Sequence, residues 1–119
     1  MIQDLYVKAL ALEDDQGLRA VLLTCDVVGF SAPTANAIID RISAGSGLDR
    51  SRILLNSSHN HTGPSVTAAA GAVLGATEAT RLDRYHQRLQ DSVVETALSA
   101  LRDLSPARLS HGSGIATFV

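Results

Sequence analysis

The spacing of apolar residues in the first half of the chain most constrains what this sequence can fold into. Residues 5–13 alternate in a period of two with apolar residues on both sides, which predicts a largely buried strand. Residues 14–17, Asp-Asp-Gln-Gly, are polar and end in glycine, as in a hairpin turn. Residues 18–25 form the return strand, which is apolar on both faces like a central strand. The chain is therefore expected to begin with a β-hairpin.

A helical period follows the hairpin. Residues 26–31 indicate a turn, in which Ser31 can cap a helix, and Pro33 is tolerated in the first helical turn. One helical face then carries Ala35, Ile38, Ile39 and Ile42. Residues 44–47, Ala-Gly-Ser-Gly, predict the end of this helix. Residues 53–55, Ile-Leu-Leu, are bounded by polar residues and predict a short buried strand.

The second half of the chain predicts a loop, a long helix and a final strand. Residues 65–79 are rich in Ala and Gly and have no clear period, which indicates a loop or a loosely helical crossing. Thr80 can cap the helix, and Ser105-Pro106 stops it. The expected inner stripe of this helix consists of Leu82, Tyr85, Leu89, Val93, Ala97, Ala100 and Leu104. Residues 107–119 have the pattern of a strand interrupted by glycines.

This order of elements predicts an α/β fold, with a mixed sheet, an N-terminal β-hairpin and helical crossovers. The strands at residues 18–25 and 53–55 should be parallel neighbours joined by a right-handed helical crossover. Both strands would then end at the same edge of the sheet, where active groups gather in such folds. Asp26 follows the first strand, and His59 and His61 follow the second. The topology therefore brings these three polar side chains together.

Composition excludes several classes of partner. The chain has 119 residues, enough for one modest domain with one core. Charged residues make up 18% and the formal net charge is −2, so a nucleic-acid-binding surface is not expected. No apolar run is long enough for a transmembrane segment, and no signal peptide is visible. The single cysteine, Cys25, excludes an intrachain disulfide and is expected to be a small buried hydrophobic residue rather than a nucleophile.

The chemistry-bearing motif is residues 58–64, Ser-His-Asn-His-Thr-Gly-Pro. Imidazole is a good zinc ligand, and histidines two positions apart on an extended backbone point the same way. His59 and His61 could both bind one metal, or one could bind while the other meets the substrate. The alternative is a pair of loop histidines bonded to backbone carbonyls. Asp26 has two interpretations as well: a cap of the turn that follows it, or a metal ligand or partner that orients a histidine.

The sequence around these histidines resembles a known enzyme family. Residues 54–64, Leu-Leu-Asn-Ser-Ser-His-Asn-His-Thr-Gly-Pro, are similar to the strand and His-Thr-His-Ser-Gly-Pro signature of the neutral/alkaline (non-lysosomal) ceramidases. Residues 4–10, Asp-Leu-Tyr-Val-Lys-Ala-Leu, resemble the family's first long strand. The hairpin, the return strand ending at Asp26 and residues 105–108 match in kind and order. The resemblance extends over nearly the whole chain and is to the N-terminal catalytic domain of that family.

The resemblance implies a zinc-dependent amidohydrolase that cleaves the N-acyl amide bond of ceramide-like lipids. In that family two histidines, a glutamate and a tyrosine hold the zinc ion. The first histidine of the signature is a ligand, which carries over to His59, and the second, here His61, lies beside the reaction centre as a catalytic residue. Zinc lowers the pKa of its bound water to about 7, and His61 would stabilise the oxyanion or carry a proton. Asn60 and Thr62 stand where the family usually has threonine and serine.

The other metal ligands of the family have no matching motif in residues 1–119, and its glycine-rich start is missing. The resemblance therefore implies an internal fragment of a single catalytic domain, incomplete at both ends and inactive by itself. It is compatible with secretion or a membrane-surface location and leaves the compartment and oligomeric state open. Two other interpretations remain. One is a non-enzymatic α/β interaction domain with structural histidines; the other is a different metal-dependent hydrolase with a self-contained site of Asp26, His59 and His61.

Overall fold

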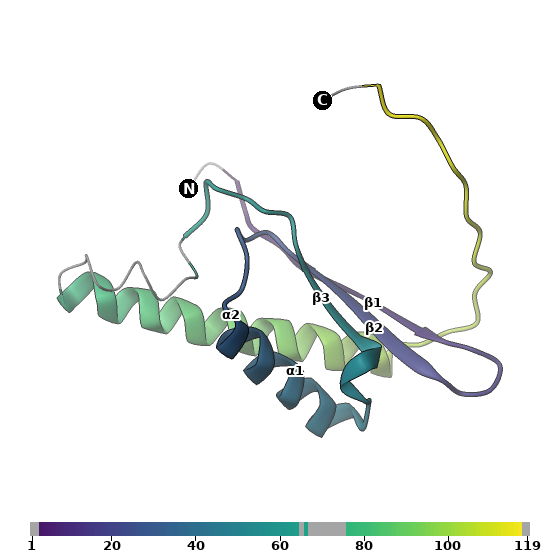
Figure 1. Cartoon of the computed structure of the whole chain (residues 1–119). Coiled ribbons are helices and arrows are strands. Elements are labelled where there is room, and N and C mark those ends of the chain that lie inside the picture. The colour runs from purple at the N-terminus through teal and green to yellow at the C-terminus, as the bar shows by residue number, and fades with distance from the viewer. Residues whose placement is uncertain (1–2, 65, 67–75, 118–119) are drawn as a thin grey trace.

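The computed structural model describes residues 3–64, 66 and 76–117 of the chain. In chain order the elements are the strands β1 (Val7–Glu13) and β2 (Arg19–Cys25), the helix α1 (Ala32–Ser46), the short 3-10 helix η1 (Arg50–Arg52), the strand β3 (Ile53–Ser57) and the helix α2 (Ala76–Arg102). The strands form a three-stranded sheet in the order β1-β2-β3 (Figure 1). The expected mixed α/β fold with an N-terminal hairpin is confirmed.

The sheet combines an antiparallel and a parallel pair. β1 and β2 are antiparallel, with Val7 opposite Cys25. β2 and β3 are parallel, with Cys25 opposite Ser57, and α1 forms the crossover between them. Antiparallel neighbours can be joined by a tight turn, whereas parallel neighbours need a long connection that is usually helical. Both strand pairings follow the sequence-based prediction.

The hairpin turn is built by Asp14 and Gly17. One carboxylate oxygen of Asp14 accepts hydrogen bonds from the backbone N–H groups of Gln16, at 3.0 Å, and Leu18, at 2.8 Å. Gly17 has a φ of 78°, in the left-handed region that glycine adopts without steric cost. An aspartate that bonds its own turn, followed by a glycine, is therefore the local cause of the hairpin.

The helix α1 begins and ends where its capping residues predict. The Ser31 side chain accepts a hydrogen bond from the N–H of Thr34 at 3.4 Å, and Pro33 lies in the first turn. Gly47 has a φ of 74°, and its N–H donates to the Ser43 carbonyl at 2.8 Å, which closes the C-terminus. Of the expected inner face, Ile38, Ile39 and Ile42 are buried, and Ala35 is half-buried.

The helix α2 begins earlier than the sequence predicted. Thr80 is not its cap, because the helix starts at Ala76 and the Thr80 hydroxyl donates to the Ala76 carbonyl at 2.9 Å within the helix. Good helix formers and Glu78 in the first turn favour this earlier start. Of the two interpretations of residues 65–79, the loop is wrong for positions 76–79, which are helical, and residues 65 and 67–75 lie outside the described residues.

The inner stripe of α2 is partly as expected. Val93 and Ala97 are buried, and Tyr85 and Leu89 pack against the core from its margin. Leu101 is buried in place of the expected Ala100 and Leu104, and Val94 is buried as well. The buried face is thus wider than one stripe, because α2 contacts both the sheet and α1.

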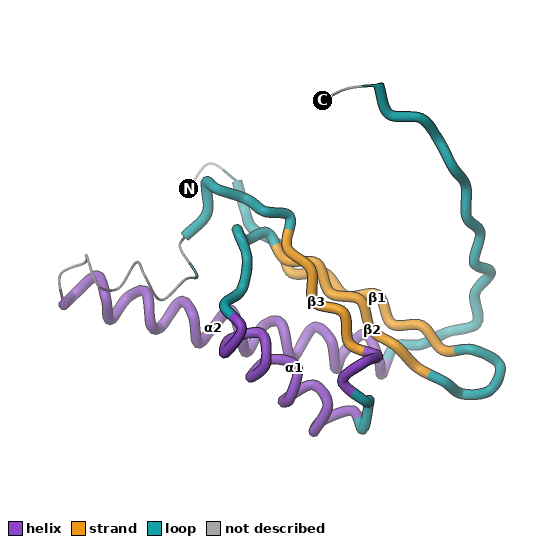
Figure 2. Tube along the Cα trace, in the orientation of Figure 1, coloured by secondary structure: helices purple, strands orange, loops and turns teal. Residues whose placement is uncertain are grey.

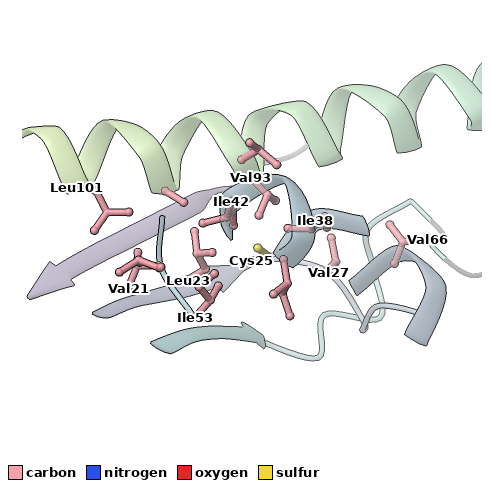
Figure 3. Close-up of a cluster of buried hydrophobic side chains, with 14 residues drawn as sticks. Val21, Leu23, Cys25, Val27, Ile38, Ile42, Ile53, Val66, Val93 and Leu101 are labelled. Atoms are coloured by element: carbon pink, nitrogen blue, oxygen red, sulfur yellow. The ribbon is translucent and has the colours of Figure 1, made fainter. Parts of the chain in front are cut away.

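Both helices cover the same face of the sheet (Figures 1 and 2). Between them and the sheet lies the core, where Leu23, Ile38 and Ile42 are completely buried (Figure 3). Cys25 is also buried there, as expected, and burial raises the pKa of its thiol to about 11, with the negative charge of Asp26 adding to the effect. A thiol held neutral in this way behaves as a small hydrophobic group.

The other face of the sheet carries exposed apolar side chains. Leu10, Leu22 and Leu54 lie directly opposite one another on the three strands. Leu10 is 50% exposed and Leu54 is 62% exposed. The predictions that β1 is largely buried and that β3 is a buried strand are therefore wrong for this face, because no described element covers it.

The chain after α2 is extended but is not a strand. Residues 104–117 have no regular secondary structure, and nearly all of their side chains are exposed. Leu109 is 81% exposed and Ile115 is 94% exposed. The predicted strand at residues 107–119 is thus not formed over 107–117, because this segment pairs with none of the three strands. Positions 118–119 lie outside the described residues.

Candidate metal centre

The loops that follow β2 and β3 lie side by side at one edge of the sheet. The parallel pairing continues past the strands, since the N–H of Ser58 donates to the Cys25 carbonyl at 3.0 Å. The N–H of Asn60 donates to the Val27 carbonyl at 3.2 Å. Asp26 and His59 therefore lie on the same edge of the sheet, as the topology predicted. Figure 1 shows both loops leaving the ends of β2 and β3 together.

His59 is held in an unusual backbone conformation. Its φ is 60°, and it is the only non-glycine residue with positive φ in the described part of the chain. The backbone is therefore not extended at His59, so the rule that histidines two positions apart point the same way on an extended backbone does not apply here. A non-glycine residue in this region costs about 1–3 kcal/mol unless its surroundings compensate. Here the flanking hydrogen bonds between the two loops fix the backbone, so the ring direction is defined.

The His59 ring bonds to the neighbouring loop through its Nδ1 atom, which lies 2.7 Å from the Val28 carbonyl oxygen. A carbonyl oxygen can only accept a hydrogen bond, so this contact requires the proton on Nδ1. The neutral ring then keeps its lone pair on Nε2. For His59 this is the bond to a backbone carbonyl that the alternative of a structural loop histidine predicts. Metal-binding histidines use the same contact to select the tautomer and orient the ligand nitrogen, so it is compatible with both interpretations.

His61 lies against His59. The two ring centroids are 4.7 Å apart, and the rings meet at 77°, in an edge-to-face arrangement. The expectation that the two histidines lie close together is therefore confirmed. Close imidazoles can share one metal ion or divide ligand and substrate roles between them.

Asp26 has a structural partner. Its carboxylate accepts a hydrogen bond from the backbone N–H of Tyr6 at 3.0 Å, and its own N–H donates to the Tyr6 carbonyl at 3.0 Å. Asp26 therefore closes the ladder between β1 and β2 rather than capping the next turn. Within residues 3–64, 66 and 76–117, no three His, Cys, Asp or Glu side chains are grouped closely enough to hold a metal ion. The structure therefore does not bring Asp26 together with His59 and His61 in one self-contained ligand set, contrary to what the topology had suggested.

The rest of the motif forms a compact turn that sequence reasoning did not foresee. The Asn60 side-chain oxygen accepts hydrogen bonds from the N–H of Thr62 at 2.8 Å and from its hydroxyl at 2.7 Å. A side chain added at Gly63 would lie 3.2 Å from Leu5 and 3.7 Å from the Asp26 carbonyl. The signal for the turn was present in the sequence, since Asn bonds to the backbone two residues ahead in such turns.

A groove of about 1610 Å³ runs beside this loop, between the start of β1 and α2. Its lining includes apolar side chains of Leu5, Val7 and Leu89. Polar groups of Asp26, Ser58, Asn60 and Arg88 also line it, whereas His59 and His61 do not. Burial raises the pKa of the Tyr85 hydroxyl in the same groove, which keeps it neutral. The groove therefore has an apolar lining from β1 and α2, and residues next to the two histidines border it.

No protein-family model, curated protein or solved structure matches this chain. In the described part of the chain, neither helix is apolar enough over sufficient length to cross a membrane.

Proposed function

We propose that this chain provides the metal-binding and reaction-side histidines of a zinc-dependent amidohydrolase. The proposed substrate is the N-acyl amide bond of a ceramide-like lipid. The resemblance of residues 54–64 to the ceramidase signature supports the reaction class. The geometry of His59 and His61 supports the zinc chemistry.

The observation that carries the proposal is the pairing of His59 with His61, whose ring centroids are 4.7 Å apart. The contact of His59 with the Val28 carbonyl at 2.7 Å is compatible with this role, although a structural loop histidine would make the same contact. It leaves the Nε2 lone pair of a neutral imidazole available, and imidazole nitrogen is a preferred zinc ligand. The strained backbone at His59 supports the same role, because such conformations concentrate at ligand sites. His59 is therefore the proposed metal ligand.

His61 is the proposed catalytic residue. Its ring is 4.7 Å from that of His59, so it lies close to any metal ion bound there. A bound zinc ion would supply hydroxide at neutral pH and polarise the amide carbonyl. His61 would donate a hydrogen bond to the developing oxyanion or move a proton to the leaving amine. Asp26 supports the site from the adjacent loop by anchoring the start of β1.

The groove beside the loop suits a long apolar chain. Leu5, Val7 and Leu89 provide its apolar lining, and the backbone of the histidine loop borders one end. Because His59 and His61 do not line this groove, it supports the binding of an apolar chain beside the histidine loop and not the placement of the carboxamide at the two rings.

Two histidines alone do not make a catalytic zinc site, which usually has three protein ligands and an open position. We therefore expect residues 1–119 to show no zinc-dependent hydrolysis of ceramides or simple N-acyl amides. Zinc should nevertheless bind weakly at the histidine pair. Turnover by the purified 119-residue chain would contradict the partial site.

The test is a titration of the chain with zinc, followed through the imidazole NMR signals. The signals of His59 and His61 should shift together, and His59→Ala should abolish the shift. The matched control is His111→Ala, which lies in the exposed segment after α2 and should leave the titration unchanged. In a protein that supplies the remaining ligands, His61→Ala should keep most of the zinc but lower kcat by about 10²–10³. If His61→Ala loses zinc as completely as His59→Ala, both are ligands.

The second candidate is a non-enzymatic interaction domain with structural histidines. The exposed row of Leu10, Leu22 and Leu54 favours it, because large apolar patches mark interaction sites. The same titration separates the two candidates. Unchanged imidazole signals at saturating zinc would support the interaction domain and remove the amidase.

A further inference from the structure

The outer edge of β1 has free backbone groups. The N–H of Asp26 donates to the Tyr6 carbonyl, and the N–H of Asp14 donates to the Leu18 carbonyl, so even-numbered residues of β1 form the hydrogen-bonded pairs with β2. In an antiparallel pair the alternate residues direct their N–H and C=O groups to the other side. The groups of Val7, Ala9 and Ala11 therefore point outward. Within the described residues no strand pairs with them.

The chain also contains an unpaired extended segment. Residues 107–117 have no regular secondary structure, and they expose Leu109 and Ile115 almost completely. Both side chains would lose contact with water if the segment packed against the sheet, which favours docking. An open strand edge and an unpaired extended segment therefore occur in the same molecule.

The direction of α2 brings the start of the unpaired segment close to the outer edge of β1. Tyr85, Leu89 and Thr96 border the groove at the start of β1, where Leu5 and Val7 lie. Farther along α2, Leu101 reaches Val21, which pairs with Ala11 near the end of β1 (Figure 3). The helix thus runs in the same direction as β1 and ends at the hairpin end of the sheet (Figure 1).

A segment that turns back after α2 would run antiparallel to β1. Residues 103–106 are a connection of ordinary length between a helix and a strand, and Pro106 prevents the helix from continuing. The edge of β3 is a poorer target, because α2 packs on β1 and β2 whereas α1 packs on β3. In this structure the segment leaves the end of α2 and curves away from the sheet (Figure 1).

We propose that residues 107–117, which pair with no strand in this structure, have a second, docked arrangement in which they add to the outer edge of β1 as a fourth, antiparallel strand of the same chain. The sheet would then have the order 107–117, β1, β2, β3. This pairing satisfies the outward groups of Val7, Ala9 and Ala11 and removes an exposed edge that would otherwise pair with other chains. The short connection favours the segment's own chain over a second copy, because it gives a high effective concentration.

Hydrogen exchange measured by NMR on the full chain tests the pairing. The amides of Val7, Ala9 and Ala11 should exchange at least about tenfold more slowly in the wild type than in the double variant Ser110→Pro/His111→Pro. Adjacent residues of a strand direct their N–H groups to opposite sides, so one of the two prolines removes a donor to β1 in either register. The amides of Lys8 and Leu10 bond to β2 and report whether the variant keeps its fold. The matched control is Ser105→Pro, which adds a proline just outside the segment and should leave all these amides unchanged.

Cross-strand nuclear Overhauser contacts in the wild type provide a direct second measurement. Contacts between residues 107–117 and β1 that do not depend on protein concentration, in a chain of monomeric mass, support the proposal. Absence of these contacts overturns it. Contacts that appear only with a dimeric mass also overturn it, since the segment then pairs with a second copy.

Discussion

The two faces of the sheet contain similar residues but differ in what covers them. One face carries Val21, Leu23 and Cys25, which are at most 2% exposed beneath α1 and α2. The other carries Leu10, Leu22 and Leu54, of which two are at least half exposed. The difference shows that an apolar side chain predicts a tendency to be buried, whereas the partner that buries it is set by the rest of the fold.

The largest expected effect is on the covered face. Leu23→Ala should destabilise the chain by about 2–5 kcal/mol, because Leu23 is completely buried and the helices cannot fully collapse onto the cavity. Denaturant unfolding followed by circular dichroism measures the change. A loss below about 1 kcal/mol would show that the covered face is loosely packed and that the two faces are more alike than the structure indicates.

A smaller effect on the same face depends on pH. The pKa of the Cys25 thiol is raised from 9.0 to about 11 in the folded chain, so the unfolded chain loses this proton first as the pH rises. The stabilisation from the neutral buried thiol is present below pH 9.0 and should be lost between pH 9.0 and about 11. Unfolding free energies at pH 8 and pH 10 measure it. Cys25→Ala should remove this part of the pH dependence, and an unchanged profile would mean that the thiol is not desolvated.

The smallest effect is expected on the open face. Leu54→Ala should change the free energy of unfolding by no more than about 0.5 kcal/mol, because the side chain is 62% exposed and leaves no cavity. The same denaturation experiment that measures Leu23→Ala provides the comparison. A loss of several kcal/mol from Leu54→Ala would show that another element or another molecule covers this face in solution.

Local signals in the sequence were sufficient to predict the elements whose ends are set by contacts between nearby residues. The hairpin, the start of α1 at Ser31 and its end at Gly47 depend on side chain–backbone contacts within a few residues, so they can be read directly. The burial of β1 and β3 could not be read in this way, because Leu10 and Leu54 are apolar whether or not an element covers them. The start of α2 was missed because strong helix formers before Thr80 outweighed its capping tendency.

For the candidate site, the sequence predicted the neighbourhood but not the geometry. The parallel crossover was enough to place Asp26 and His59 on one edge of the sheet. A bond from a loop histidine to a backbone carbonyl was among the alternatives, but the Val28 carbonyl could not be predicted as its partner, because the contact joins positions in two different loops. The positive φ of His59 could not be predicted either, because this backbone conformation is imposed by the folded loop.

The parallel pairing of β2 and β3 also has a consequence for the order of events during folding. The β1–β2 hairpin closes through a tight turn, and such hairpins form in about 1–10 μs. β2 and β3 are separated in the sequence by α1, so their pairing has a larger loop-closure entropy cost than the hairpin. The pairing of β3 with β2 is therefore expected to form after the hairpin. The loop of His59 is fixed by bonds to residues after β2, and it therefore assembles only when β3 has docked. A substitution that slows the formation of α1 would therefore slow the assembly of the histidine loop, even though it changes no residue of that loop.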